Sequence, residues 1–303
     1  MSPQIVFLCF HPWSRAVQSA TDNQQTKMQN YYKTISALAA ASALAAGNAQ
    51  AGTTPATTTM AATPSAPVAD SGITYDMHVG YTNEYLFRGI SLGQDLVEAG
   101  FDVSGQALGL DLSAGVWYAN YEAPILGFQG SSNVNEIDLY AKVSKDLGFL
   151  TASVGYIYYY NDLDSVNALA NGFANGNGTD ALDLADQQEV FFSLSRDLGF
   201  ATASLTYFWD IVLDNGGYSE FALSKSYELS PCLGLNVGTN VGYLVEEGIP
   251  TAWTTKVGID WSFAERAKLS PFVAYSVSLG DKPAAYNGNQ NEFVAGSMLS
   301  VSF

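Results

Sequence analysis

The feature that most constrains the fold of this chain is an alternation of apolar and polar residues that begins at Ile73 and recurs to its end. In the first segment Tyr75 and Met77 lie on one parity, whereas Asp76 and His78 lie on the other. A period of two residues predicts a β-strand with one apolar and one polar face. No run of about 18 apolar residues occurs, so the chain offers no candidate for a membrane-spanning helix.

The alternation recurs in twelve segments, and the connections between them fall into two length classes. One apolar-parity residue identifies each segment: Val79, Val97, Val116, Leu139, Val154, Phe192, Leu205, Leu223, Val237, Val257, Val273 and Leu299. Short turns are predicted at 105–109, 146–148, 197–199, 230–234 and 264–268, and longer connections at 122–133, 161–186 and 280–290. We therefore predict an all-β fold, an antiparallel transmembrane β-barrel of about 12 strands over residues 73–303, with short periplasmic turns and longer extracellular loops.

A secreted β-sandwich would show the same alternation, so the pattern alone leaves two folds open. Aromatic residues favour the barrel, because those on the apolar parity gather at segment ends, where interfacial girdles lie. Tyr156 and Trp209 are examples, and Trp253 and Trp261 stand at opposite ends of one segment. The last segment ends in the aromatic Phe303, as in proteins inserted by the outer-membrane assembly machinery.

The apolar parity is assigned to lipid and the polar parity to the lumen. Tyr85 and Phe87 share the apolar parity of the first segment, so they are predicted to face lipid. Lys145 and Arg196 have lipid parity beside short turns, where a long side chain can snorkel to the interface. Lys225 lies further into the membrane, and either it snorkels or a bulge shifts the register there. Glycines within the segments fall on the inward parity, which curvature crowds: Gly80, Gly100, Gly115, Gly155, Gly238, Gly242, Gly258 and Gly296.

The region before the first segment is divided into three parts. Residues 28–51 contain a positive region, an apolar stretch and an Ala-x-Ala motif ending at Ala51, which predicts a cleaved signal peptide. The apolar stretch is too short to cross a bilayer of about 30 Å as a helical anchor. Residues 1–27 lack such a pattern and are interpreted as an upstream extension from a wrongly assigned start codon. Residues 52–72 are rich in Thr, Ala and Pro and are predicted to form a disordered leader.

A short motif at the end of the first segment resembles a known family. Residues 85–91 read Tyr-Leu-Phe-Arg-Gly-Ile-Ser, and residues 115–117 read Gly-Val-Trp. An aromatic-x-Phe-Arg-Gly-Ile-Ser motif followed by Gly-Val-Trp resembles the TorF family of porins, and the likeness extends over residues 73 to 121. It implies an outer-membrane porin but neither a substrate nor catalytic residues. The motif residues are Tyr85, Phe87, Arg88, Gly89, Ile90 and Ser91.

Arg88 lies on the inward parity near the extracellular end. It could place a charge at the mouth of a pore, or form an ion pair with Glu84 or a neighbouring lumen carboxylate. We favour the ion pair, because an arginine inside a narrow barrel needs a partner.

Side chains for enzymatic chemistry are sparse. His78 is the one histidine after residue 51, and no serine is marked as a nucleophile beside it, so we predict that the chain is not an enzyme. His78 is interpreted as a polar member of the lumen. Cys232 is the one cysteine after residue 51, which excludes an internal disulfide there. No metal, cofactor or nucleic-acid partner is predicted.

The polar parity is strongly acidic, in keeping with a formal net charge of −17. Carboxylates around a water-filled passage concentrate cations. The predicted pore-lining residues are Asp76, His78, Glu84, Arg88, Glu98, Asp102, Asp111, Glu136, Asp138, Lys142, Glu189, Asp210, Glu220, Glu228, Lys256, Asp260 and Glu292. Inward aromatic and apolar residues could obstruct the passage: Trp117, Tyr121, Ile157, Tyr159, Phe191, Phe208 and Phe272.

The pattern as a whole predicts a porin-like channel for passive passage of small solutes, with a preference for cations. The alternative is a non-conducting surface barrel that acts as a scaffold or adhesin through its extracellular loops. In either case we expect the mature chain in the outer membrane of a Gram-negative bacterium after cleavage near Ala51. Its expected partners are outer-membrane lipid and lipopolysaccharide, the assembly machinery through Phe303, and small solutes or cations.

Overall fold

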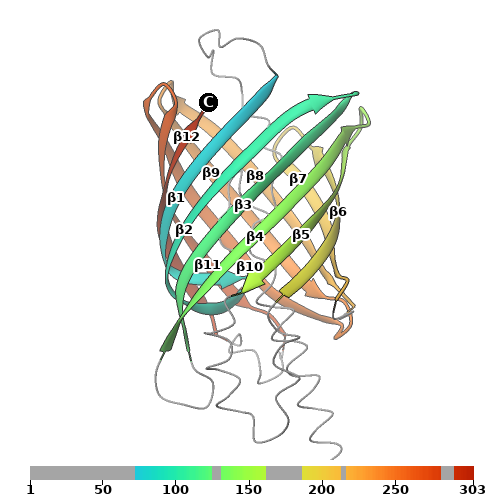
Figure 1. The fold of residues 1–303 in the computed structure, drawn as a ribbon, viewed down its shortest axis with the longest axis vertical. Helices are drawn as coiled ribbons and strands as arrows, with labels where there is room; N and C mark the ends of the chain where they lie inside the picture. Colours follow the sequence, from blue (N-terminus) through green and yellow to red (C-terminus); the bar gives the residue numbers. More distant parts are fainter. Residues whose placement is uncertain (1–71, 125–130, 162–185, 213–215, 281–289) are drawn as a thin grey trace, which may run out of the picture.

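The computed structural model describes residues 72–124, 131–161, 186–212, 216–280 and 290–303, which form one closed antiparallel barrel (Figure 1). Its strands are β1 (Ile73–Phe87), β2 (Ile90–Ala107), β3 (Leu110–Pro124), β4 (Ser131–Asp146), β5 (Thr151–Asn161), β6 (Asp186–Asp197), β7 (Thr202–Asp210), β8 (Tyr218–Ser230), β9 (Leu233–Leu244), β10 (Ile249–Ala264), β11 (Ala267–Ser278) and β12 (Glu292–Ser302). Each strand pairs with its neighbours in sequence, and β1 pairs with β12 to close the sheet. The predicted fold class is confirmed. The predicted signal peptide and most of the leader lie outside the described residues.

The alternation of the sequence becomes the difference between the outer and inner faces of the barrel. Met77 and Val79 point outward and are 51% and 48% exposed, whereas His78 between them points inward and is 5% exposed. Large apolar side chains cover the outside of every strand in this way. An apolar surface of that extent does not persist in water, so the barrel is of the membrane-spanning kind. In the part of the chain that the structure describes, no helix is long and apolar enough to cross a membrane.

The duplicated turn sequence Asp-Leu-Gly-Phe forms the same structure twice. Gly148 (φ 83°) and Gly199 (φ 85°) both adopt the left-handed conformation that glycine permits. The carboxylates of Asp146 and Asp197 each accept a hydrogen bond of 2.7 Å from the amide of that glycine. The β4–β5 and β6–β7 connections are therefore tight and polar, as expected for periplasmic turns.

The seam between the first and last strands ends in a pair of backbone hydrogen bonds. The amide of Tyr75 donates to the carbonyl of Phe303 at 3.1 Å, and the amide of Phe303 donates to the carbonyl of Tyr75 at 2.8 Å. These bonds lie at the end of the barrel that carries the short turns (Figure 1). Closure leaves no strand edge facing lipid, which the membrane interior requires.

Lys225 keeps its expected place in the β8–β9 ladder, and its side chain extends to the membrane interface. It pairs with Val237 in the β8–β9 ladder and therefore shares the outward face. Its Nζ donates a 3.0 Å hydrogen bond to the carbonyl of Gly199 in a short turn. Of the two predicted alternatives the structure supports the snorkelling side chain, which carries its charge to the periplasmic interface.

The prediction that Tyr85 and Phe87 face lipid is wrong. The register between β1 and β2 shifts between Tyr85 and Leu86, which is a β-bulge. Around this shift four consecutive residues, Glu84 to Phe87, are all buried, because the end of the hairpin turns into the lumen. Residues of both parities then point away from lipid, and alternation no longer indicates which of them face it.

Candidate functional site in the barrel lumen

The inward-facing side chains differ between the two ends of the lumen. At the end with the longer connections, here called the extracellular half, Glu136 and Asp138 are 0% exposed and Trp117 is 2% exposed. At the end with the short turns, the periplasmic half, the side chains of Asp76 and Asp102 remain 32% and 19% exposed. The extracellular half is therefore filled, and the periplasmic half is accessible to water.

The tip of the β1–β2 hairpin, residues 85–90, contributes to the filling. Arg88 (φ 47°) and Gly89 (φ 80°) form its two-residue turn, and two successive positive φ angles are typical of a type I′ turn. A Cβ placed on Gly89 would overlap the Cβ of Ala252 on β10. Glycine is thus required at position 89 both by the backbone conformation and by the close approach to β10.

Leu86 of the tip contacts the wall formed by β11 and β12. It packs in a buried cluster with Phe272 and Ala274 of β11 and Val294 of β12. The tip therefore contacts β10, β11 and β12 at once, which places it inside the barrel rather than beyond its rim.

Arg88 extends from the tip to the far side of the lumen. Its Nη1 donates to Oε1 of Glu189 at 3.1 Å and its Nη2 donates to Oε2 at 2.8 Å, which is a bidentate ion pair. Glu189 lies on β6, five strands from β1 in one direction around the closed sheet and seven in the other. The hydroxyl of Tyr159 also donates to Glu189, at 3.0 Å. The ion pair consequently spans the lumen and fixes the tip to the opposite wall.

Aromatic rings surround the guanidinium group of Arg88. Its Cζ lies 4.8 Å from the ring centroid of Phe87, 4.6 Å from that of Phe208 and 4.3 Å from that of Tyr218. Cation–π attraction adds to the ion pair in such a desolvated position. Residues of β1, β6, β7 and β8 thereby meet around one charged group.

Tyr85, the first residue of the tip, packs against aromatic residues of β3. Its ring centroid lies 4.7 Å from that of Tyr121 and 6.0 Å from that of Trp117. Its hydroxyl donates to Oε2 of Glu136 at 3.2 Å. The tyrosine that the alternation assigned to lipid thus anchors the hairpin tip inside the lumen.

Other carboxylates of the extracellular half are also hydrogen-bonded to the wall. Glu98 accepts a 2.8 Å bond from Nε1 of Trp117. Glu220 accepts bonds of 2.6 Å from Nδ2 of Asn240 and 3.3 Å from the hydroxyl of Tyr218. Each of these buried acids is thus hydrogen-bonded to a neighbouring side chain, as buried charged groups usually are.

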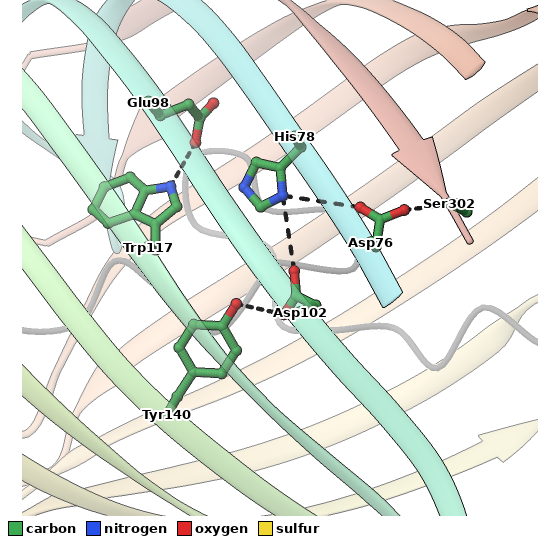
Figure 2. A network of polar contacts seen from close by, with 7 residues as sticks. All are labelled: Asp76, His78, Glu98, Asp102, Trp117, Tyr140 and Ser302. Atoms are coloured by element: carbon green, nitrogen blue, oxygen red, sulfur yellow. Dashed lines mark hydrogen bonds and ion pairs between the residues drawn. The ribbon is translucent and has the colours of Figure 1, made fainter. Parts of the chain in front are cut away.

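The periplasmic half holds a smaller polar cluster, seen in Figure 2. Nδ1 of His78 lies 4.0 Å from Oδ1 of Asp76 and 3.8 Å from Oδ2 of Asp102. The other oxygen of Asp76 accepts a 2.6 Å bond from Ser302, and the other oxygen of Asp102 accepts a 2.5 Å bond from Tyr140. Within the described residues this is the one grouping of three side chains that could hold a metal ion.

One inward cation was missed by the sequence interpretation. Lys268 was assigned to a turn, but β11 begins at Ala267 and Lys268 donates a 3.1 Å bond to Asp260 on the inner face. Both side chains are 27% exposed, so this ion pair is in contact with water. A boundary error of one or two residues at a strand end is enough to hide such a residue.

The predicted lumen residues lie either in the β1–β2 turn or on the inward parity of the strands. Arg88 lies in the turn and pairs with Glu189, not with Glu84, which instead accepts a hydrogen bond from Ser91. The remaining residues lie in strands on the inward parity: Asp76, His78, Glu84, Glu98, Asp102, Asp111, Glu136, Asp138, Lys142, Glu189, Asp210, Glu220, Glu228, Lys256, Asp260 and Glu292. That they line a conducting path stays a prediction.

These observations define a transmembrane β-barrel of the outer-membrane type whose lumen contains an inward-folded hairpin tip at one end. The chain belongs to the family described as a bacterial protein of unknown function (Gcw_chp), whose model matches residues 66–262. The matched region contains the hairpin tip and Glu189. Membership of the TorF family stays a prediction, and no curated protein matches the chain.

The chain is also similar to solved outer-membrane structures. An outer-membrane channel from Pseudomonas putida F1 is 12% identical with a TM-score of 0.47, over 78% of this chain and 100% of that one. The KdgM porin is 10% identical with a TM-score of 0.40, over 76% and 99%. The CymD monoaromatic hydrocarbon channel is 8% identical with a TM-score of 0.42, over 77% and 88%.

Proposed function

We propose that the chain is an outer-membrane channel for small solutes and that the β1–β2 hairpin tip is the gate that closes its extracellular half. The observation that carries this proposal is the ion pair across the lumen, between Arg88 of the tip and Glu189 of β6. Eight strands make a barrel that wall side chains alone can fill, whereas the width grows with strand number. A barrel of twelve strands is wider. If a hairpin closes such a barrel, movement of the hairpin opens a passage.

The water-accessible periplasmic half supports the same function. Asp76, Asp102 and Asp260 keep part of their side chains exposed on the inner face, where they can contact a solute entering from the periplasm. Among the residues that the structure describes, the restriction that a solute has to pass is therefore the hairpin tip in the extracellular half.

Within this proposal the channel prefers cations. Acidic residues outnumber bases on the inward parity, and two of the four inward bases named above, Arg88 and Lys268, are paired with carboxylates. A surplus of carboxylates along a narrow aqueous path attracts cations and repels anions.

Single-channel recording on refolded protein tests the gate. We expect rare or small openings in the wild type, and longer or larger openings in the double variant Arg88→Ala/Glu189→Gln, which removes the ion pair without leaving a buried charge. The matched control is Arg196→Ala, which removes an exposed arginine at the periplasmic end of β6 and should leave conductance unchanged. Equal conductance in the wild type and the double variant would contradict a gate at the hairpin tip.

A second function, a non-conducting surface scaffold, is favoured by the close packing of side chains in the extracellular half. Glu136, Asp138 and Tyr159 are all 0% exposed. Under this alternative the Arg88–Glu189 pair is a permanent structural element. Absence of conductance from both the wild type and the double variant, with both proteins folded, would favour the scaffold.

A further inference from the structure

Three potential metal ligands meet on the inner face of β1 and β2 in the periplasmic half. In the ladder between these strands Asp76 lies directly opposite Asp102, and His78 lies directly opposite Gly100. The imidazole and both carboxylates converge on one point of the lumen (Figure 2). The candidate ligand atoms lie within 4.8 Å of one another.

The two carboxylates occupy an unfavourable position when both are ionised, and a cation between them would relieve the repulsion. Like charges directly opposite each other on neighbouring strands destabilise a sheet. Among the described residues, neither Asp76 nor Asp102 forms an ion pair within 4.0 Å with a lysine or arginine, and Lys142 acts on Asp102 only from a greater distance. No permanently charged cation is therefore in direct contact with the cluster.

The imidazole of His78 is buried and unpaired. Its side chain is 1% exposed, and both ring nitrogens lack a hydrogen-bond partner, as does Oδ2 of Asp102. Buried polar atoms nearly always have a partner, so unpaired ones aimed at the same point indicate an absent ligand.

The distances fit a bound ion better than a direct contact. The separations of 4.0 and 3.8 Å between Nδ1 of His78 and the two carboxylates exceed hydrogen-bond length. They also exceed, by about 0.5 Å, the separation of about 3.4 Å between the ligand atoms of a tetrahedral zinc ion with bonds of about 2.1 Å. The side chains therefore have to move slightly closer together to bind an ion at these atoms.

Neighbouring residues orient both carboxylates toward that point. Ser302 binds one oxygen of Asp76 and Tyr140 binds one oxygen of Asp102, which leaves the other oxygen of each facing His78. Hydrogen bonds of this kind orient ligating carboxylates around protein-bound metals. The ring of His78 is held in place because it lies over Gly100, where a Cβ would overlap it.

We propose that Asp76, His78 and Asp102 form a binding site for one divalent transition-metal ion of the zinc type. Nδ1 of His78, Oδ1 of Asp76 and Oδ2 of Asp102 are its ligands, and lumen water completes the coordination. The imidazole nitrogen selects against Ca²⁺ and Mg²⁺, which take oxygen ligands. The site requires only the closed barrel and does not depend on whether the lumen conducts.

Zinc binding to the refolded, tag-free barrel tests the site. After removal of metal with a chelator and dialysis against Zn²⁺, we expect one ion per wild-type barrel by mass spectrometry of bound metal. His78→Ala and Asp102→Asn should abolish this binding, and Tyr140→Phe should weaken it by about 10-fold or more, as loss of an orienting hydrogen bond does. Zn²⁺ should also raise the melting temperature of the wild type, because the ion links β1 to β2.

The matched control is Asp260→Asn. Asp260 is another inward carboxylate of the periplasmic half, but it is bound by Lys268 and Ser270 and is not part of the cluster. This variant should bind Zn²⁺ as the wild type does. No bound Zn²⁺ in the wild type, or equal binding in the wild type, Asp102→Asn and Tyr140→Phe, would overturn the proposal. Asp102→Asn and Tyr140→Phe keep the shape of their side chains, so the test does not rest on the folding of His78→Ala.

Discussion

The extracellular and periplasmic halves of the lumen are built from the same strands, the same alternation and the same surplus of carboxylates, yet one is filled and the other is open to water. In the extracellular half Glu189 is 1% exposed and meets a buried arginine. In the periplasmic half Asp260 is 27% exposed and meets a lysine that is equally exposed. The halves differ because a hairpin tip enters one of them and not the other.

This difference shows which part of the chain controls the lumen. The inward parity supplies polar groups all along the barrel, but a charged group on a wide wall cannot exclude water by itself. The tip brings Tyr85, Leu86, Phe87 and Arg88 into the middle of the extracellular half. The acids that face it are then held by hydrogen bonds rather than by water.

The largest expected effect is loss of the barrel in which the two halves exist. Deleting Phe303 removes the two backbone hydrogen bonds with Tyr75 that end the seam. We expect the truncated protein to remain in the periplasm and be degraded, since an open edge cannot face lipid. Membrane fractionation measures this, with Phe303→Tyr as a control that keeps the backbone and an aromatic ring. Wild-type amounts of the truncated protein in the outer membrane would contradict the prediction.

The next effect should open the extracellular half alone. Gly89→Val places a side chain where a Cβ already overlaps Ala252, in a backbone conformation with φ 80°. We expect a loss of about 1–3 kcal/mol from overpacking, in addition to about 1–2 kcal/mol from the backbone. Displacement of the tip should also expose the inner wall, which urea unfolding and thiol labelling can measure separately.

A reporter cysteine in each half makes this test specific. In a Cys232→Ser background, Ala119→Cys reports on the extracellular half, where Ala119 is 0% exposed, and Asn236→Cys reports on the periplasmic half. Gly89→Val should accelerate labelling of the first reporter and not of the second. The control Gly148→Val has φ 83° with no atom within 4 Å of the added Cβ, so it should cost stability without changing either labelling rate. Rapid labelling of both reporters in the parent protein would contradict the proposed difference in water accessibility between the halves.

A smaller effect is expected when the two ion pairs, Arg88–Glu189 and Asp260–Lys268, are compared by their contribution to the free energy of unfolding. Arg88→Ala leaves Glu189 buried without its partner and should cost about 3–5 kcal/mol of unfolding free energy. Adding Glu189→Gln should cost less than the sum of the two single changes, because the residues are in contact. Lys268→Ala, in the water-accessible pair, should cost less than about 1 kcal/mol. Urea unfolding in detergent micelles measures all of these, and equal costs for the two pairs would contradict the assignment of one half as filled.

The smallest expected effect concerns ion selectivity and rests on the proposed channel. Neutralising Asp111 and Glu228, which are exposed at the periplasmic end, should modestly reduce the preference for cations in reversal potentials under a KCl gradient. The effect should vanish near molar salt, where the Debye length is about 3 Å. Glu136→Gln/Asp138→Asn should change selectivity only in the Arg88→Ala/Glu189→Gln background, since both acids are 0% exposed behind the tip. A wild-type channel that prefers anions would contradict the role given to the lumen carboxylates.

The sequence by itself determined the barrel and the assignment of most residues to its two faces. Alternation is a property of each strand alone, because successive side chains of an extended backbone point to opposite sides. It therefore placed Glu136, Asp138 and His78 inside and Met77 outside without knowledge of the partner strands. The duplicated Asp-Leu-Gly-Phe turns were likewise readable, because each turn is stabilised by an aspartate and a glycine two residues apart.

The tertiary structure alone decided how the lumen is filled. The bulge at Tyr85 and Leu86 depends on the register between β1 and β2, and the hairpin tip there buries residues of both parities, Phe87 as well as Leu86. The partner of Arg88 is 101 residues away and comes within reach only when the sheet closes, which brings β6 across from β1. Asp102 joins Asp76 and His78 through the same kind of cross-strand register. Contacts of this sort depend on how strands pair and curve, and a pattern of period two along one strand contains no information about either.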